Sequence, residues 1–139
     1  MPLPRQILWL RIGAALVIAS GILVLSGAHP ATAALLRFCA DLLFWPVDGA
    51  PGDLTQTTRL LCAIGGGVML GWGVMIWHIA ALLPQAVARR AILSGILLWF
   101  VADSLGSILA GAWLNVAGNL VFLALFCAPL FEPNKVNGG

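Results

Sequence analysis

The chain has 139 residues, of which 61% are hydrophobic and only 9% are charged, and its mean hydropathy is +1.03. A soluble domain usually carries about 25% charged residues, so seven basic and five acidic side chains are too few to cover a water-exposed surface of this size. The composition excludes an ordinary soluble domain, and a net charge of +2 with scattered basic residues argues against a nucleic-acid partner.

The first predicted transmembrane helix covers about 7–27, because a bilayer core about 30 Å thick needs about 20 apolar residues. Its only interior charge is Arg11, whose long side chain can reach the interface. The basic start, the apolar run and Ala31-Thr32-Ala33 also fit a secretory signal peptide, whose cleavage would leave three spans. We expect the segment to stay in place, because its apolar run is long enough to anchor the chain.

A shorter amphipathic helix is predicted in the loop after the first span, over about 33–45, with Thr32 as its cap. Its apolar residues cover a wide arc and Arg37 and Asp41 are spaced i, i+4, so we expect the helix to lie at the membrane surface. Such a helix either covers the end of the bundle or acts as a lid or docking element. Cys39 and Cys62 can form a disulfide if both lie at this side, although three cysteines give no disulfide framework.

Three further spans are predicted at about 59–83, 91–110 and 112–131. The last two must form a tight antiparallel hairpin, because the turn between them, near Gly111, is very short. The predicted fold is therefore all-α: a single polytopic membrane domain over 1–139, built as a four-transmembrane-helix bundle with one interfacial helix.

The basic residues predict the orientation of the bundle, since cytoplasmic loops are enriched in Lys and Arg. One side has only Arg37 and Arg59, and the other has five basic residues: Arg5, Arg11, Arg89, Arg90 and Lys135. We therefore expect the multi-pass chain to lie in a bacterial inner membrane with its N-terminus and C-terminus in the cytoplasm.

Small residues indicate the faces along which membrane helices pack, because they let two backbones approach closely. Gly67 and Gly71 form a GxxxG pair in the second span. The full set of predicted helix-packing glycines is Gly65, Gly66, Gly67, Gly71, Gly106 and Gly118. We expect them to mark interior faces of the bundle, whereas GxxxG faces left exposed would favour an oligomer or a partner.

A layer of polar side chains is predicted inside the membrane around Asp103. Placing an ionised Asp at this depth costs about 2.5–3.5 kcal/mol, so the carboxyl group must face the interior and find hydrogen-bond donors. Counting about 1.5 Å per residue places Asp103 and Asn119 at about the same level, about 10 Å below the outer face. The predicted layer consists of Asp103, Ser107, Asn115, Asn119 and Ser20. It is either a clamp between the last two spans or a site for a ligand or ion.

No motif for catalysis, metal binding or phosphate binding is present in the sequence. His29 and His78 are predicted nearly a bilayer apart, which excludes a haem held by both histidines of one subunit. We therefore expect neither an enzyme nor a metal site nor a cofactor.

Three stretches carry a resemblance to known proteins: FWPVDGAP, TRLLCAIGGGVMLGWGVMIW and DSLGSILAGAWLNVAGNLVFLALF. They resemble a family of small four-helix bacterial inner-membrane proteins whose members are uncharacterised. The resemblance covers most of the chain after about Leu36. It implies the four-helix architecture and the inner-membrane location, and it implies no activity, ligand or site residue.

The sequence favours a non-enzymatic accessory or helix-packing subunit, surrounded by the lipid bilayer and partnered in a homo-oligomer or a larger membrane complex. The first alternative is a small carrier or channel for a proton, cation or small molecule that uses the buried Asp103. The second is an electron-transfer subunit that binds a cofactor through His78.

Overall fold

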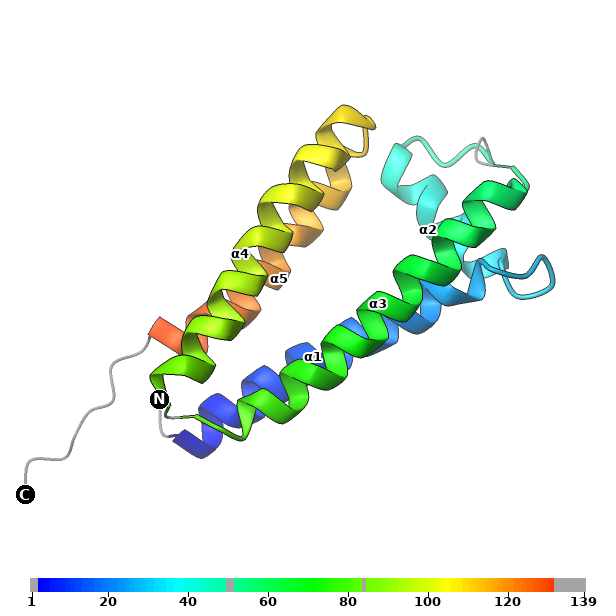
Figure 1. Cartoon of the computed structure of the whole chain (residues 1–139). Helices are drawn as coiled ribbons and strands as arrows, with labels where there is room; N and C mark the ends of the chain where they lie inside the picture. Colours follow the sequence, from blue (N-terminus) through cyan, green and yellow to red (C-terminus); the bar gives the residue numbers. More distant parts are fainter. Residues whose placement is uncertain (1–2, 50–51, 84, 132–139) are drawn as a thin grey trace, which may run out of the picture.

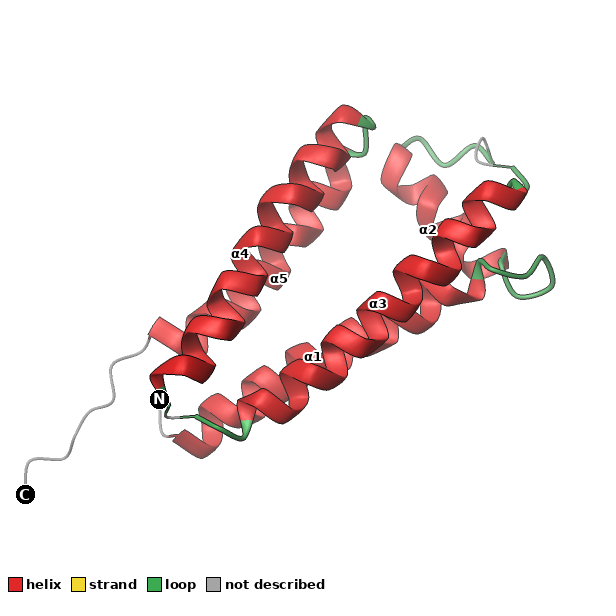
Figure 2. Cartoon of the chain, viewed as in Figure 1, coloured by secondary structure: helices red, strands yellow, loops and turns green. Residues whose placement is uncertain are grey.

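A computed structural model of the chain describes residues 3–49, 52–83 and 85–131. These residues form five α-helices and no strand (Figure 1; Figure 2). In chain order the helices are α1 (Leu3–Ser26), α2 (Ala34–Phe44), α3 (Gln56–Ala80), α4 (Ala86–Leu109) and α5 (Trp113–Phe131). All but α2 are long and apolar enough to cross a membrane. The predicted all-α bundle is thus confirmed, and the chain is a multi-pass membrane protein.

The four long helices form two hairpins, α1 with α3 and α4 with α5 (Figure 1). The start of α1 and the end of α5 lie at one end of the bundle, which we call the terminal end, and α2 lies at the other, the loop end (Figure 1). The hairpins contact each other chiefly through α1 and α5. They lie close together at the terminal end and diverge toward the loop end (Figure 1).

Helices α1, α3 and α4 begin earlier than the predicted spans, most clearly α4, which starts at Ala86 instead of about 91. Apolar residues mark the part of a helix that lies inside the bilayer. Backbone hydrogen bonding continues beyond that part through residues such as Ala and Arg, which favour helices at the interface.

Four of the five basic residues predicted for one side lie at the terminal end, and the fifth, Lys135, lies outside the described residues.

The apolar core joins the two hairpins in the terminal half of the bundle. Its buried members are Leu10, Ala14, Val17, Ile76, Ala80, Leu83, Ala88, Ile92, Ile96, Phe126 and Leu130. All but two come from the half of their helix that is nearer the terminal end; Val17 lies just past the middle of α1, and Leu83 lies in the turn after α3. In the same half the Arg11 guanidinium lies 5.2 Å from the centre of the Trp77 ring, a cation–π contact.

Glycines allow α1 and α3 to touch backbone to backbone. A Cβ atom added to Gly66 would lie 2.5 Å from the Leu25 nitrogen and 2.8 Å from the Gly21 oxygen. A Cβ atom on Gly73 would lie 2.6 Å from the Ile18 side chain. Residues 66 and 73 are seven apart and so share one face of α3. This face, which includes the predicted packing residue Gly66, is the contact with α1.

The other predicted packing glycines have different surroundings. A Cβ atom added to Gly65 meets only Val24, at 3.9 Å. Nothing lies within 4 Å of a Cβ added to Gly67, Gly71, Gly106 or Gly118. The expectation that they mark interior faces is therefore wrong for Gly67, Gly71 and Gly106 in the single chain, whereas Gly118 lines a cavity between the helices. Successive residues turn by about 100° around a helix, so when Gly66 faces α1, Gly67 and Gly71 face outward.

Thr32 has a different role from the predicted one. Its hydroxyl donates to the Ser26 carbonyl at 2.6 Å and to the His29 carbonyl at 3.1 Å, while the N-cap residue of α2 is Ala33. The last carbonyls of a helix lack partners within it, and Thr32 satisfies the one at the end of α1. The predicted cap on α2 is wrong, because a hydroxyl in so short a turn can serve either helix end.

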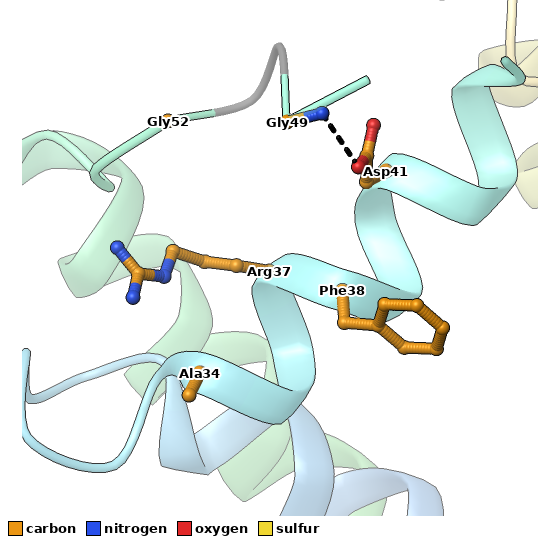
Figure 3. Close-up of a pocket in the computed structure, with 6 residues that line it drawn as sticks. All are labelled: Ala34, Arg37, Phe38, Asp41, Gly49 and Gly52. Atoms are coloured by element: carbon orange, nitrogen blue, oxygen red, sulfur yellow. Dashed lines mark hydrogen bonds between the residues drawn. The ribbon is translucent and has the colours of Figure 1, made fainter. Parts of the chain in front are cut away.

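Helix α2 presents apolar side chains outward and polar ones toward the loop. Leu35, Phe38 and Leu42 are exposed, whereas Asp41 is only 6% exposed. Asp41 accepts a hydrogen bond from the backbone nitrogen of Asp48 at 3.2 Å. It accepts another from the backbone nitrogen of Gly49 at 2.9 Å (Figure 3). The apolar outer face agrees with a helix at the membrane surface.

The i, i+4 spacing of Arg37 and Asp41 does not produce an ion pair between them. Arg37 pairs instead with Asp53, beyond the loop, because Asp41 is held by backbone donors. Cys39 and Cys62 are free thiols, so the disulfide considered from the sequence is not formed.

Candidate functional site

The candidate site lies where α4 and α5 face each other near the loop end. Gly111 has a positive φ of 78°, a conformation that costs glycine little, and the chain reverses there between the two helices. Asp103 and Ser107 are four residues apart on α4, and Asn115 and Asn119 are four apart on α5. That spacing places each pair on one face of its helix, and the short turn brings the two faces together.

The amide groups of both asparagines donate to the same carboxylate oxygen. Asn119 Nδ2 lies 2.6 Å from Asp103 Oδ2, and Asn115 Nδ2 lies 3.1 Å from it. The amides also reach two hydroxyl groups: Asn115 Nδ2 lies 2.8 Å from Ser107 Oγ, and Asn119 Nδ2 lies 3.2 Å from Ser104 Oγ. The structure therefore brings together four of the five residues predicted for the polar layer.

Ser104 is a member of this cluster that sequence reasoning missed. It is 7% exposed, like Ser107, and its partner Asn119 is 4% exposed. A signal for it was available, since Ser104 and Ser107 are three residues apart and share a face of α4. Together these groups satisfy the buried polar atoms that the two helices would otherwise leave unpaired in lipid.

Only one oxygen of the Asp103 carboxylate takes part in the cluster. Both hydrogen bonds end on Oδ2, and the described residues give no hydrogen bond to Oδ1. Asp103 is half-buried, and it lines a cavity between the two hairpins. The carboxylate thus links α4 to α5 through one oxygen, while Oδ1 has no hydrogen-bond partner among the described residues.

The cavity has a volume of about 320 Å³ and is lined by all four long helices. Its polar wall is formed by Asp103, Asn115 and Asn119. Ser20 lies on the wall contributed by α1, and the structure shows no hydrogen bond from it to the cluster. The fifth predicted residue therefore shares the cavity with the other four without touching the carboxylate.

Three aromatic rings form another part of the lining. Trp72 from α3 lies 5.9 Å from Trp99 of α4, and Trp99 lies 6.2 Å from Phe122 of α5, measured between ring centres. Trp99 precedes Asp103 by one helical turn, about 6 Å along the axis, on the side of the terminal end. The rings therefore lie between the carboxylate and the apolar core.

The histidines take no part in this site. His29 lies in the turn after α1, where its Nδ1 accepts from the Ala31 nitrogen at 3.2 Å, and His78 is exposed near the end of α3 at the terminal end. Within 3–49, 52–83 and 85–131 no group of three or more His, Cys, Asp or Glu side chains is arranged to hold a metal ion.

Comparison with known proteins assigns the chain to no family. No protein-family model, no curated protein and no solved structure matches the chain.

Proposed function

We propose that this chain is a non-enzymatic carrier that binds a small organic cation in the cavity beside Asp103. The observation behind the proposal is a carboxylate with one unused oxygen in a cavity of about 320 Å³ between two helix hairpins. An acidic side chain inside a membrane is costly, and its usual role is in a pathway for an ion or a substrate.

The lining of the cavity favours a cation over an anion or a neutral molecule. Asp103 is the one ionisable side chain among the residues described as lining it, so a bound cation would supply the missing opposite charge. Trp72, Trp99 and Phe122 also line the cavity, and aromatic rings attract quaternary or protonated amines. The volume falls at the lower end of the range for small-molecule sites, about 300–1,000 Å³, which favours a compact ligand.

The arrangement of the hairpins supports a carrier. The apolar core closes the bundle in its terminal half, while the hairpins diverge toward the loop end (Figure 1). Asp103 lies in the half of α4 that is nearer the loop end. Rocking of one hairpin against the other about the α1–α5 contact would expose the same carboxylate to the opposite side. A single carboxylate can hold either a proton or the cation, so proton–cation exchange needs no second ionisable group.

The proposal places the chain in a bacterial inner membrane with both termini in the cytoplasm. Its support is the excess of Lys and Arg in the segments at the terminal end. In this orientation the diverging end of the bundle and α2 face the periplasm.

The test is cation binding to the purified chain in lipid nanodiscs. The probe is benzyltrimethylammonium, and neopentylbenzene serves as its uncharged isostere. Asp103→Asn keeps the shape and hydrogen-bonding capacity of the side chain and removes its charge. We expect it to weaken cation binding about 100-fold, because the quaternary ammonium has no N–H to donate and loses its charge attraction to the carboxylate, about 3 kcal/mol at roughly 5–6 Å with an effective dielectric constant of about 20.

The matched control is Asp53→Asn, because Asp53 is an exposed carboxylate at the loop end outside the cavity lining. It should bind the cation as the wild-type chain does. Equal affinities for Asp103→Asn and wild type, or equal affinities of wild type for the cation and its neutral isostere, would contradict the proposal.

A second function, as an accessory subunit of a membrane assembly, is favoured by the outward face of α3. Gly67 and Gly71 are exposed and have open space around them, as expected for a GxxxG face that packs against another chain. Gly71→Leu should then shift the chain from oligomer to monomer in light scattering after mild detergent extraction. A wild-type chain that is already monomeric in nanodiscs and mild detergent would contradict a homo-oligomer.

A further inference from the structure

A second hollow lies at the terminal end of the bundle, between the start of α4 and the end of α5. It has a volume of about 230 Å³ and is lined by Ala86, Arg89, Arg90, Leu93, Leu130 and Phe131. We propose that this hollow binds the phosphate group of an anionic phospholipid. The site is separate from the cavity at Asp103, so it does not depend on the carrier proposal.

The two arginines of this hollow have different roles. Arg89 donates through Nη2 to the Leu130 carbonyl, so its guanidinium is fixed across the gap between the two helices. Arg90 is exposed, and the structure describes neither a hydrogen bond nor an ion pair for its side chain. Arg90 therefore keeps all its donors for a ligand, and a planar guanidinium suits the oxygens of a phosphate group.

The backbone at this end adds positive potential. Helix α4 begins beside the hollow at Ala86, and its N-cap residue Gln85 makes no side-chain hydrogen bond to the first turn. The first N–H groups of a helix lack partners within it and attract anions. Ala86, at the start of α4, and Arg90, one turn later, both line the hollow.

No negative charge of the described residues competes for these groups. Asp41, Asp48 and Asp53 all lie at the loop end, and Asp103 lies in the half of α4 nearer to it. The terminal end, in contrast, has Arg5 and Arg11 as well as the two arginines of the hollow. Among the described residues the charge at this end is therefore positive; Glu132, which follows Phe131, lies outside the described residues.

The apolar part of the lining selects a lipid over a soluble phosphate. Leu93, Leu130 and Phe131 lie beside the arginines, and Phe131 is exposed. Both helices belong to spans, so this end of the bundle lies where head groups meet acyl chains. A basic pocket between transmembrane helices at that depth is suited to an anionic head group, whose acyl chains can extend along the apolar surface.

The test measures which lipids stay bound to the chain. The protein is extracted from mixed vesicles of dioleoylphosphatidylglycerol and dioleoylphosphatidylcholine, and the lipids retained are counted by native mass spectrometry. We expect a preference for phosphatidylglycerol. Arg90→Gln should reduce that preference about fivefold, as for the loss of one basic residue near an anionic membrane surface. Arg90→Lys should retain an intermediate preference, because lysine keeps the charge and loses the planar fork.

Two variants serve as controls. Arg59→Gln removes a charge near the loop end, and Arg5→Gln removes one at the terminal end outside the hollow. Both should keep the wild-type preference, and circular dichroism should show unchanged helix content in all variants. An equal loss in Arg5→Gln would indicate diffuse attraction and overturn the site, as would an unchanged preference in Arg90→Gln. Inorganic phosphate should not displace the bound phosphatidylglycerol. If phosphate displaces the lipid and the chain shows no preference for phosphatidylglycerol, the lipid assignment is overturned.

Discussion

The contact between α1 and α3 gives a sharp prediction about two adjacent glycines. Gly66→Ala should destabilise the chain, whereas Gly67→Ala should not. A Cβ atom at position 66 would lie 2.5 Å from the Leu25 nitrogen and 2.8 Å from the Gly21 oxygen. At position 67 nothing lies within 4 Å of the added atom. The two substitutions add the same methyl group at neighbouring positions of one helix.

The size of the difference follows from which atoms are contacted. The atoms nearest to the new methyl group at position 66 belong to the backbone of α1, so no side-chain rotation can relieve the overlap and the helices must separate. Overpacking of this kind costs about 1–3 kcal/mol. The gain in helix propensity from Gly to Ala, about 1 kcal/mol or less, applies equally to both variants and cancels in the comparison.

The measurement is unfolding in mixed micelles with increasing sodium dodecyl sulfate, followed by tryptophan fluorescence. We expect Gly66→Ala to unfold at a lower detergent fraction than Gly67→Ala, with a free-energy difference of about 1–3 kcal/mol. Gly21→Ala, on the facing side of the same contact, should behave like Gly66→Ala, since its Cβ would lie 2.9 Å from the Leu70 nitrogen. Equal stabilities at positions 66 and 67 would refute the packing described for α1 and α3.

Three further predictions concern the site and the orientation. Asn119→Ala should destabilise the α4–α5 hairpin by about 0.6–1.7 kcal/mol in the same unfolding assay, because it removes the donor to Asp103 and Ser104. An unchanged stability would show that the cluster is not a clamp. Trp99→Leu should weaken binding of benzyltrimethylammonium about 2- to 30-fold by removing a cation–π contact, and an unchanged affinity would remove the aromatic wall from the site. Lys135→Cys, in a chain whose three native cysteines are replaced by alanine, should react with a membrane-impermeant maleimide only from the cytoplasmic side. Labelling from the periplasm would reverse the proposed orientation.

The polar cluster could be predicted from the sequence because it depends on local relations. Asp103 and Asn119 lie on either side of one short turn, and each has a second polar residue four positions away on its own helix. Helical spacing and the length of the turn were enough to bring these side chains together. The same reasoning extended to Ser104 would have found the fifth hydrogen-bonding member.

The faces of the glycine-rich helix could not be predicted in this way. Glycines occur around most of the circumference of α3, so their positions alone do not say which side meets α1. The contact is decided by the match of Gly66 with Gly21 on another helix, a relation between residues far apart in the sequence. As a result Gly67 and Gly71, which form the more recognisable motif, lie on the outside.

Competition between partners explains the errors near α2. The Thr32 hydroxyl had two helix ends within reach and serves α1. Asp41 had Arg37 at i, i+4 and backbone N–H groups in the loop, and it takes the backbone groups. The cavity itself arises from three rings on three helices together with the carboxylate, an arrangement that no local pattern specifies.

The measurement that tests the carrier most directly is exchange of benzyltrimethylammonium for protons in proteoliposomes. The wild-type chain should take up the cation when the lumen is acidified, and Asp103→Asn should abolish this pH-driven uptake while it still folds and inserts. Asp53→Asn, which changes a carboxylate outside the cavity, should transport like wild type. Equal uptake by wild type and Asp103→Asn would contradict a carrier that uses the buried carboxylate and would leave Asp103 with the role of a clamp between α4 and α5.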